Sequence, residues 1–178
     1  EVLGDYLNAK GNLVYSAFSR DLNLREVELQ PGAQLVWALD FNVDPMSSVI
    51  AQGSGGVVRV LDEIFLRHAT TQQACEEFWR RYPAHRGGVW IFGDASGHHE
   101  QTTGLSDYQV IRDFFRVNGG KRPEYRVPTC NPSVRERTNL VNSRLRSAAG
   151  AIGLLVDGKC KELVRDFEEV AYKEQSSQ

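Results

Sequence analysis

The chain has 178 residues, 41% of them hydrophobic, which suits one globular domain with a buried core. No apolar run approaches the roughly 20 residues needed to cross a bilayer, and no secretory signal opens the chain, so we expect a soluble cytosolic protein without membrane partners. The net charge of −2 at pH 7, taken alone, disfavours a nucleic-acid partner. The chain starts at Glu1 and its only methionine is Met46, which indicates a fragment of a longer protein.

The first half of the chain predicts a lead-in followed by a strand meander. Residues 1–31 mix short apolar patches with glycine and charges and show no sustained period, so we expect a linker or lead-in there and a domain over 32–178. Apolar or alternating runs at 34–40, 46–53 and 57–66 are typical of strands. The short turns between them favour antiparallel pairing.

The second half predicts helices alternating with strands, which together with the meander indicates an α/β domain with a mixed sheet of five or six strands. Most boundaries are marked by capping residues, proline or glycine. The expected elements are a helix capped by Thr70 and ending before Pro83, a strand at 89–94, a helix capped by Ser106 and ending at Asn118, a strand at 124–129, a helix with Asn131 as N-cap and Pro132 as its first residue running toward Ala148, a strand at 153–157 and a final helix.

Several site classes are disfavoured by what the sequence lacks. Cys75, Cys130 and Cys160 are odd in number and far apart, without a CxxC or Cys/His cluster, so we expect buried reduced thiols instead of a disulfide or zinc site. No GxxxxGK[ST] phosphate-binding loop is present, so an ATPase domain is missing from this chain.

Two aspartates stand at the ends of predicted strands. Asp40 closes the run QLVWALD and Asp94 closes VWIFGD, and these two strands should be neighbours in the sheet. Carboxylates at neighbouring strand ends can share Mg²⁺ or Mn²⁺, because hard cations prefer oxygen ligands. The alternative is that each aspartate simply bonds the turn that follows its strand.

Positive charge is concentrated in one segment. Between Arg112 and Arg146 nine Lys or Arg face three Asp or Glu, a local net of +6, so the remainder carries −8. One side of the predicted third helix is polar and suits sequence-independent contacts with phosphates, although a merely solvated face is the alternative. That side is formed by Arg135, Asn139, Asn142 and Arg146.

Five segments in order resemble the nuclease domain of tailed-bacteriophage terminase large subunits, the DNA-packaging motor proteins. They are ALDFNVDP, VVRVLDEI, VWIFGDASGHHEQTTGLSDYQVIRDFF, NPSVRERTNLVNSRL and CKELVRDFEEV, which cover nearly the whole chain. The resemblance implies an RNase H-like fold and an endonuclease that cuts concatemeric duplex DNA with two Mg²⁺ or Mn²⁺ ions. It also implies portal protein and small terminase subunit as partners, and action in the host cytoplasm.

Carried over by position, the resemblance makes Asp40 and Asp94 metal ligands and catalytic residues. The family has a third acidic ligand late in the domain, often in an Asp-Ala-Leu tripeptide that is absent here. Either Asp166 supplies it, or it lies beyond Gln178. Another RNase H-like nuclease, such as a junction resolvase, and a non-catalytic DNA-binding or docking module are the rival interpretations.

Four further residues near these aspartates keep open roles. Asp44 either coordinates through water or holds the turn before a proline, and Glu63 either approaches the site or pairs with Arg67. His98 and His99 follow Asp94 in a polar loop, where a histidine can act on a leaving group but more often has no such role.

Overall fold

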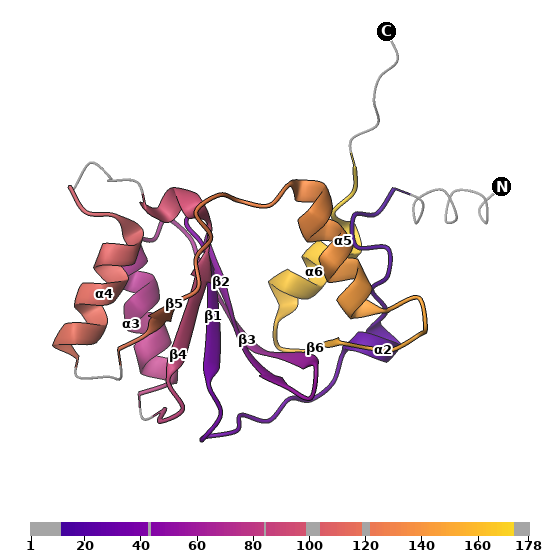
Figure 1. The fold of residues 1–178 in the computed structure, drawn as a ribbon, viewed down its shortest axis with the longest axis horizontal. Helices are drawn as coiled ribbons and strands as arrows, with labels where there is room; N and C mark the ends of the chain where they lie inside the picture. Colours follow the sequence, from indigo (N-terminus) through magenta and orange to yellow (C-terminus); the bar gives the residue numbers. More distant parts are fainter. Residues whose placement is uncertain (1–11, 43, 84, 99–103, 119–121, 173–178) are drawn as a thin grey trace, which may run out of the picture.

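Six strands form one mixed sheet in the order β5-β4-β1-β2-β3-β6 (Figure 1). The structure is a computed structural model that describes residues 12–42, 44–83, 85–98, 104–118 and 122–172. The strands are β1 (Leu35–Asp40), β2 (Met46–Ser54), β3 (Val57–Leu66), β4 (Val89–Gly93), β5 (Glu124–Tyr125) and β6 (Leu154–Val156). The helices are α2 (Arg20–Asn23), α3 (Thr71–Arg81), the 3-10 turn η1 (Ala95–His98), α4 (Asp107–Val117), α5 (Val134–Leu145) and α6 (Lys161–Glu169).

Strand pairing confirms the predicted mixed α/β architecture. β1 pairs antiparallel with β2, and β2 with β3, as expected of the meander. β4 lies parallel to β1 on its other side, which makes these two strands neighbours as predicted. β5 was predicted over 124–129, but it is ordered as a strand at only two residues, because the chain leaves the sheet edge and crosses toward α5 (Figure 1).

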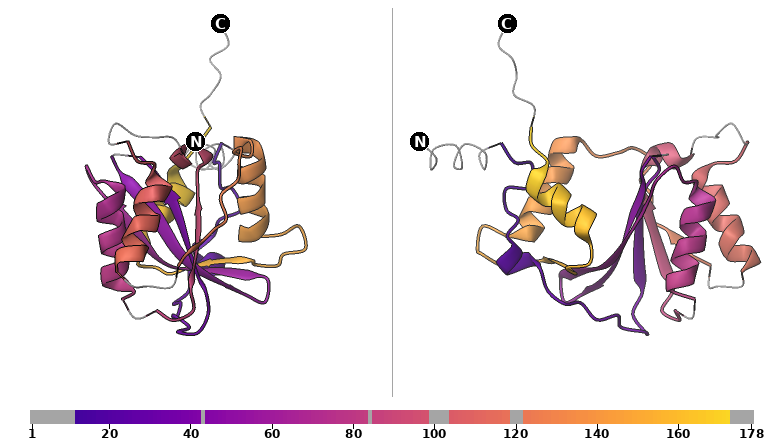
Figure 2. Two further views of the ribbon diagram at one scale, coloured as in Figure 1. Left: turned by 60° about the vertical axis from the view of Figure 1, so that its left-hand side comes forward. Right: turned by 180° about the vertical axis from the view of Figure 1, so that it is seen from behind.

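Helices cover both faces of the sheet, with α3 and α4 on one side and α5 and α6 on the other (Figure 2). The α3/α4 side holds the larger core, where the buried rings of Trp37 and Phe78 stack with centroids 4.3 Å apart. The α5/α6 side holds a second core that includes Leu145, Val156 and Phe167. Within the described residues, no helix has the length and apolar character needed to cross a membrane.

The second core also receives residues that precede the sheet. The rings of Tyr15 and Phe18 contact Phe167 at centroid distances of 5.0 and 5.2 Å. The buried Asn23 side chain donates to the carbonyl oxygens of Leu145 and Leu154 at 2.9 and 3.0 Å. Residues 12–24, within the segment for which we predicted a linker or lead-in, are therefore packed on the α5/α6 side.

A β-bulge in β3 changes which face its side chains occupy. Ile50 pairs with Asp62 while Ala51 pairs with Val60, so Leu61 is an extra residue in β3. Val60 points into the core beneath α6, whereas Ile64 points into the core beneath α3, although both have even numbers. The bulge places Glu63 on the α6 side of the sheet.

Helix caps agree with the sequence at two of three predicted sites. Thr70 and Gln73 form a capping box at α3, and the Ser106 hydroxyl accepts from the Gln109 N–H at α4. The prediction of Asn131 as N-cap is wrong, because Ser133 caps α5 in a box with Glu136. The Asn131 side chain instead bonds Asp94 and the backbone of Ala95.

The three cysteines are free thiols, as predicted. Cys75 and Cys160 are buried, where desolvation raises the pKa of each thiol to about 12. Cys130 is exposed, which corrects the expectation that all three are buried, because it lies in the segment that crosses the surface between β5 and α5.

Candidate active site

Asp40 and Asp94 lie side by side at one end of the sheet. Asp40 is the last residue of β1, and Asp94 directly follows β4. These strands are parallel, and their last paired residues are Leu39 and Gly93, so the two aspartates occupy the next position of the register. The structure therefore brings together the two carboxylates that the sequence singled out.

The two carboxyl groups differ in their electrostatic surroundings. Partial burial raises the pKa of Asp40, and the charge of Asp94 raises it further. Asn42 opposes this effect by donating from Nδ2 to Asp40 Oδ2 at 2.8 Å. Two adjacent carboxylates that repel each other and offer only oxygen atoms fit a divalent cation, which would relieve the repulsion.

Asp94 is held by neighbours on both carboxylate oxygens. Asn131 Nδ2 donates to Oδ2 at 2.7 Å, and the Ser96 N–H donates to Oδ1 at 2.8 Å. These bonds, that of Asn131 first, lower the pKa of Asp94 to about 2. The Tyr108 hydroxyl donates to the Asp94 carbonyl oxygen at 2.9 Å, so the backbone is fixed as well.

Glycine is required just before Asp94. A Cβ at Gly93 would lie 2.5 Å from the Tyr108 hydroxyl oxygen and 3.1 Å from the Leu39 carbonyl oxygen. The absence of a side chain at this position lets Tyr108 reach the backbone of Asp94.

Asp166 lies on α6 and lines a pocket of 570 Å³ that Asp40 also lines. The pocket lies over β1, β2 and β3 beside α6, and Glu63, Arg67 and Glu162 are among its other lining residues. Burial raises the pKa of Asp166, with smaller effects from charges on its own helix. In the part of the chain that the structure describes, no three Asp, Glu, His or Cys side chains are grouped closely enough to hold one metal ion.

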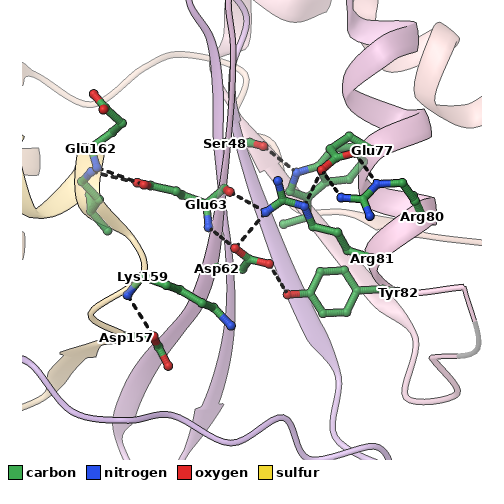
Figure 3. A network of polar contacts seen from close by, with 12 residues as sticks. Ser48, Asp62, Glu63, Glu77, Arg80, Arg81, Tyr82, Asp157, Lys159 and Glu162 are labelled. Carbon is green, nitrogen blue, oxygen red and sulfur yellow. Dashed lines mark hydrogen bonds and ion pairs between the residues drawn. The ribbon is translucent and has the colours of Figure 1, made fainter.

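Glu63 acts as a cap for α6 from outside that helix. Its Oε1 and Oε2 accept hydrogen bonds from the backbone N–H groups of Glu162 and Leu163 at 2.9 and 2.8 Å (Figure 3). A carboxylate suits this place, because the first N–H groups of a helix lack partners within it. Glu63 thus joins β3 to the helix that carries Asp166.

The neighbouring Asp62 points to the opposite side of the sheet, toward α3 (Figure 3). It accepts a hydrogen bond from Arg81 Nη1 at 2.8 Å and one from the Tyr82 hydroxyl at 3.2 Å. Arg81 also bonds Glu77 on α3. Consecutive residues of β3 therefore anchor a helix on each face of the sheet.

The polar face predicted for DNA lies on α5, but its members are not equivalent. Arg135, Asn139 and Arg146 are exposed. The Asn142 side chain accepts from the Ala17 N–H at 3.0 Å and donates to the Val14 carbonyl oxygen at 2.8 Å. Asn142 therefore fastens residues 14–17 to α5.

Arg137 is a residue that sequence reasoning missed. It is exposed in the N-terminal part of α5, and its positive charge lowers the pKa of both Asp40 and Asp94. Arg135, two residues before it, falls on the all-polar side of the helix and therefore fits the pattern expected of a phosphate-binding face. Arg137 is one of the nine basic residues between Arg112 and Arg146, but nothing in the sequence distinguishes it from the others. Its place near the two aspartates is clear only from the fold, in which Asn131 bonds Asp94.

Of the remaining residues with open roles, Asp44 and His98 lie in the described part of the chain. The Asp44 carboxylate lies 3.6 Å from Arg67 Nη1 and 3.5 Å from His68 Nδ1, so Arg67 pairs with Asp44 instead of Glu63. The His98 ring lies 4.7 Å from the Tyr108 ring, centroid to centroid. His99 lies outside the described residues.

Comparisons with known proteins identify the fold. No protein-family profile and no curated protein matches the sequence. The nuclease domain of the P22 large terminase matches with a TM-score of 0.64 and 13% identity, over 91% of this chain and 80% of that one. A large terminase from a thermophilic bacteriophage matches with a TM-score of 0.64 and 16% identity, over 92% of this chain and 38% of that one. This chain has the fold of a phage large-terminase nuclease domain.

The RNase H-like fold that the sequence resemblance implied is thereby confirmed. The chain covers only 38% of the length of the thermophilic-phage large terminase. Two further matches were crystallised with metal. They are the SPP1 large-terminase nuclease domain with bound Mn (TM-score 0.56, 16% identity, 92% of this chain and 84% of that one) and the phage G20c large-terminase nuclease with bound magnesium (TM-score 0.56, 14% identity, 93% and 84%).

Proposed function

We propose that this chain is the metal-dependent nuclease domain of a viral terminase large subunit and cuts concatemeric duplex DNA with little sequence preference. The observation that carries the proposal is the pair of aspartates, Asp40 and Asp94, at adjacent ends of parallel strands. The fold of solved terminase nucleases supports it, since two of those were crystallised with Mn or magnesium.

In this proposal Asp40 and Asp94 hold Mg²⁺ or Mn²⁺, two ions are expected, and Asp166 is the candidate for a third carboxylate. Such ions supply activation of a water molecule and stabilisation of the leaving oxygen in phosphodiester cleavage. Asn42 and Asn131 orient the two carboxylates by donating hydrogen bonds to them. Arg137, whose charge acts on both aspartates, binds the substrate phosphate next to them.

The proposed partners follow from the same assignment. Duplex DNA contacts the exposed polar residues of α5, which are Arg135, Asn139 and Arg146. In this proposal the domain works in the host cytoplasm as part of a motor with an ATPase domain, the portal protein and the small terminase subunit.

The test is Mn²⁺-dependent cutting of supercoiled plasmid by the 178-residue chain and its Asp40→Ala variant. We expect the variant to lose cutting while its circular dichroism spectrum is retained, because Asp40 is exposed at a strand end and leaves no cavity. Asp21→Ala, which removes an exposed aspartate of α2, is the matched control and should cut normally. Unchanged cutting by Asp40→Ala would refute the metal site.

A further inference from the structure

Asn131 makes two hydrogen bonds that join the segment before α5 to the end of β4. Its Nδ2 donates to Asp94 Oδ2 at 2.7 Å, and its Oδ1 accepts from the Ala95 N–H at 2.9 Å. The bond to Asp94 joins residues 37 positions apart in the sequence. It ties the segment that crosses from β5 to α5, at the top of the sheet in Figure 1, to the end of β4. Within the described chain, no other residue of α5 or of the segment 126–133 before it has a hydrogen bond to Asp94.

The chemistry of the amide fits this place in one orientation only. A carboxylate oxygen must face the NH₂ group, and a backbone N–H must face the carbonyl oxygen, so a flipped amide would lose both bonds. A serine or threonine hydroxyl is too short to replace both, and an aspartate would put a third negative charge beside Asp94. The arrangement therefore specifies asparagine.

We propose that Asn131 is a positioning residue, which holds the Asp94 carboxylate in the orientation that binds the divalent cation and fastens the N-terminal end of α5 beside it. This inference rests on the proposed function, since it gives Asp94 the role of metal ligand. Each carboxylate oxygen carries two lone pairs, and the bonds from Asn131 and Ser96 occupy one on each oxygen. The others remain available to a cation.

The same contact sets the place of Arg137. Ser133 caps α5 two residues after Asn131, and the Arg137 N–H bonds the Ser133 carbonyl oxygen, so Arg137 lies one helical turn beyond the cap. Loss of the Asn131 contact would remove the two hydrogen bonds that hold this helical turn beside Asp40 and Asp94. Partners of metal ligands typically change metal affinity by about 10- to 100-fold when removed.

The experiment measures Mn²⁺ affinity without DNA, by the electron paramagnetic resonance signal of free Mn²⁺, in the 178-residue chain. Four variants are compared: Asn131→Ala, Asp94→Ala, the double variant, and Asn118→Ala as the matched control, an exposed asparagine that follows α4. Asn131→Ala should weaken Mn²⁺ binding about 10-fold. The double variant should bind no more weakly than Asp94→Ala, because Asn131 acts through Asp94, and Asn118→Ala should match the parent chain.

The outcomes separate the two proposals. If Asp94→Ala binds Mn²⁺ as tightly as the parent chain, the proposed metal site fails, and this inference fails with it. If Asp94→Ala weakens binding and Asn131→Ala does not, only the positioning role is wrong. Equal weakening by Asn131→Ala in the presence and absence of Asp94 would also refute it, because the effect would then be structural. If Asn131→Ala fails to fold, Asn131→Gln replaces it, because glutamine keeps both polar groups on a longer side chain. Asn131→Gln must then weaken Mn²⁺ binding, but by less than Asp94→Ala does.

Discussion

At the scale of single residues, charge around the acidic pair decides how a phosphate can approach it. Two carboxylates repel a phosphodiester, and Arg137 is the cation whose charge lowers the pKa of both. No ion pair joins Arg137 to another described residue, whereas Arg20, Arg67, Arg80, Arg81, Arg116, Arg126 and Arg165 are all paired. Its guanidinium is thus available to a ligand.

We therefore predict that Arg137→Ala weakens DNA binding by the metal-free chain at every sequence tested. The slope of log affinity against log salt should fall by about 1, because one phosphate contact is lost. Fluorescence anisotropy with a labelled duplex in EDTA measures both quantities. Arg116→Ala, which removes an arginine already paired with Asp113 on α4, across the sheet from α5, should leave the slope unchanged. Equal slopes for Arg137→Ala and the parent chain would rule out the contact.

Part of this candidate site could be predicted from the sequence. Asp40 and Asp94 each end an apolar run that predicts a strand, but aspartate often ends a strand by bonding the next turn, so the resemblance to terminase nucleases was needed to favour metal ligands. Asn131 could not, because its most common use before a proline is to cap a helix, and its bond to Asp94 depends on how β5 leaves the sheet. Arg137 depended in turn on Asn131.

At the scale of elements, α6 is docked through its first turn. The Glu63 carboxylate accepts from two backbone N–H groups of the helix, and Val164 and Phe167 supply the buried apolar side. We predict that Glu63→Ala lowers the free energy of unfolding by about 1–2 kcal/mol, as the loss of a helix cap does. Urea unfolding measures this. Glu169→Ala, at the exposed C-terminal end of α6, should cost nothing, and an equal loss in both variants would contradict the capping role.

The ion pairs of Glu77 within α3 make stability depend on pH. Hydrogen bonds from Arg80 and Arg81 lower the pKa of Glu77 from 4.5 to about 2, so the folded state binds this proton less readily than the unfolded state. The resulting stabilisation is fully present above about pH 5 and is lost as pH falls toward 2. Because Glu77 remains 20% exposed, we expect a loss on the order of 1 kcal/mol.

Thermal unfolding between pH 6 and pH 3 tests the role of Glu77. The Glu77→Gln variant should be less stable than the parent chain at pH 6, and the difference should shrink toward pH 3. The Glu76→Gln variant, which leaves the Arg80 and Arg81 contacts in place, is the control and should follow the parent chain. A constant difference between Glu77→Gln and the parent chain across this range would exclude the linkage.

The elements themselves were mostly predictable, since β1, β2, β3, β4, α3 and α4 follow from apolar periodicity and capping residues. The bulge at Leu61 was not, because it appears only as a shift in the pairing between β2 and β3. Simple alternation therefore could not tell that Glu63 faces α6 while Asp62 faces α3. The role of Glu63 remained open in the sequence for that physical reason.

At the scale of the whole molecule, the sheet separates two cores that depend on different parts of the chain. The core beneath α3 and α4 is built after residue 32, apart from a peripheral contact by Val27. The core beneath α5 and α6 also includes Tyr15, Phe18 and Leu24. The second core draws these residues from a segment without hydrophobic periodicity, so their packing was not evident in the sequence.

The domain boundary predicted at residue 32 stays a prediction, and shortened chains test it. A chain of residues 32–178 keeps the whole sheet and should fold, but it lacks the ring contacts to Phe167 and the two Asn23 hydrogen bonds. Burial of an aromatic side chain contributes roughly 1.5–3 kcal/mol, so we expect it to be less stable than residues 12–178 by about 3–5 kcal/mol. Urea unfolding of both chains gives the difference. Equal stability would show that residues 12–31 add nothing to the domain, whereas a 32–178 chain that fails to fold would move its start toward residue 12.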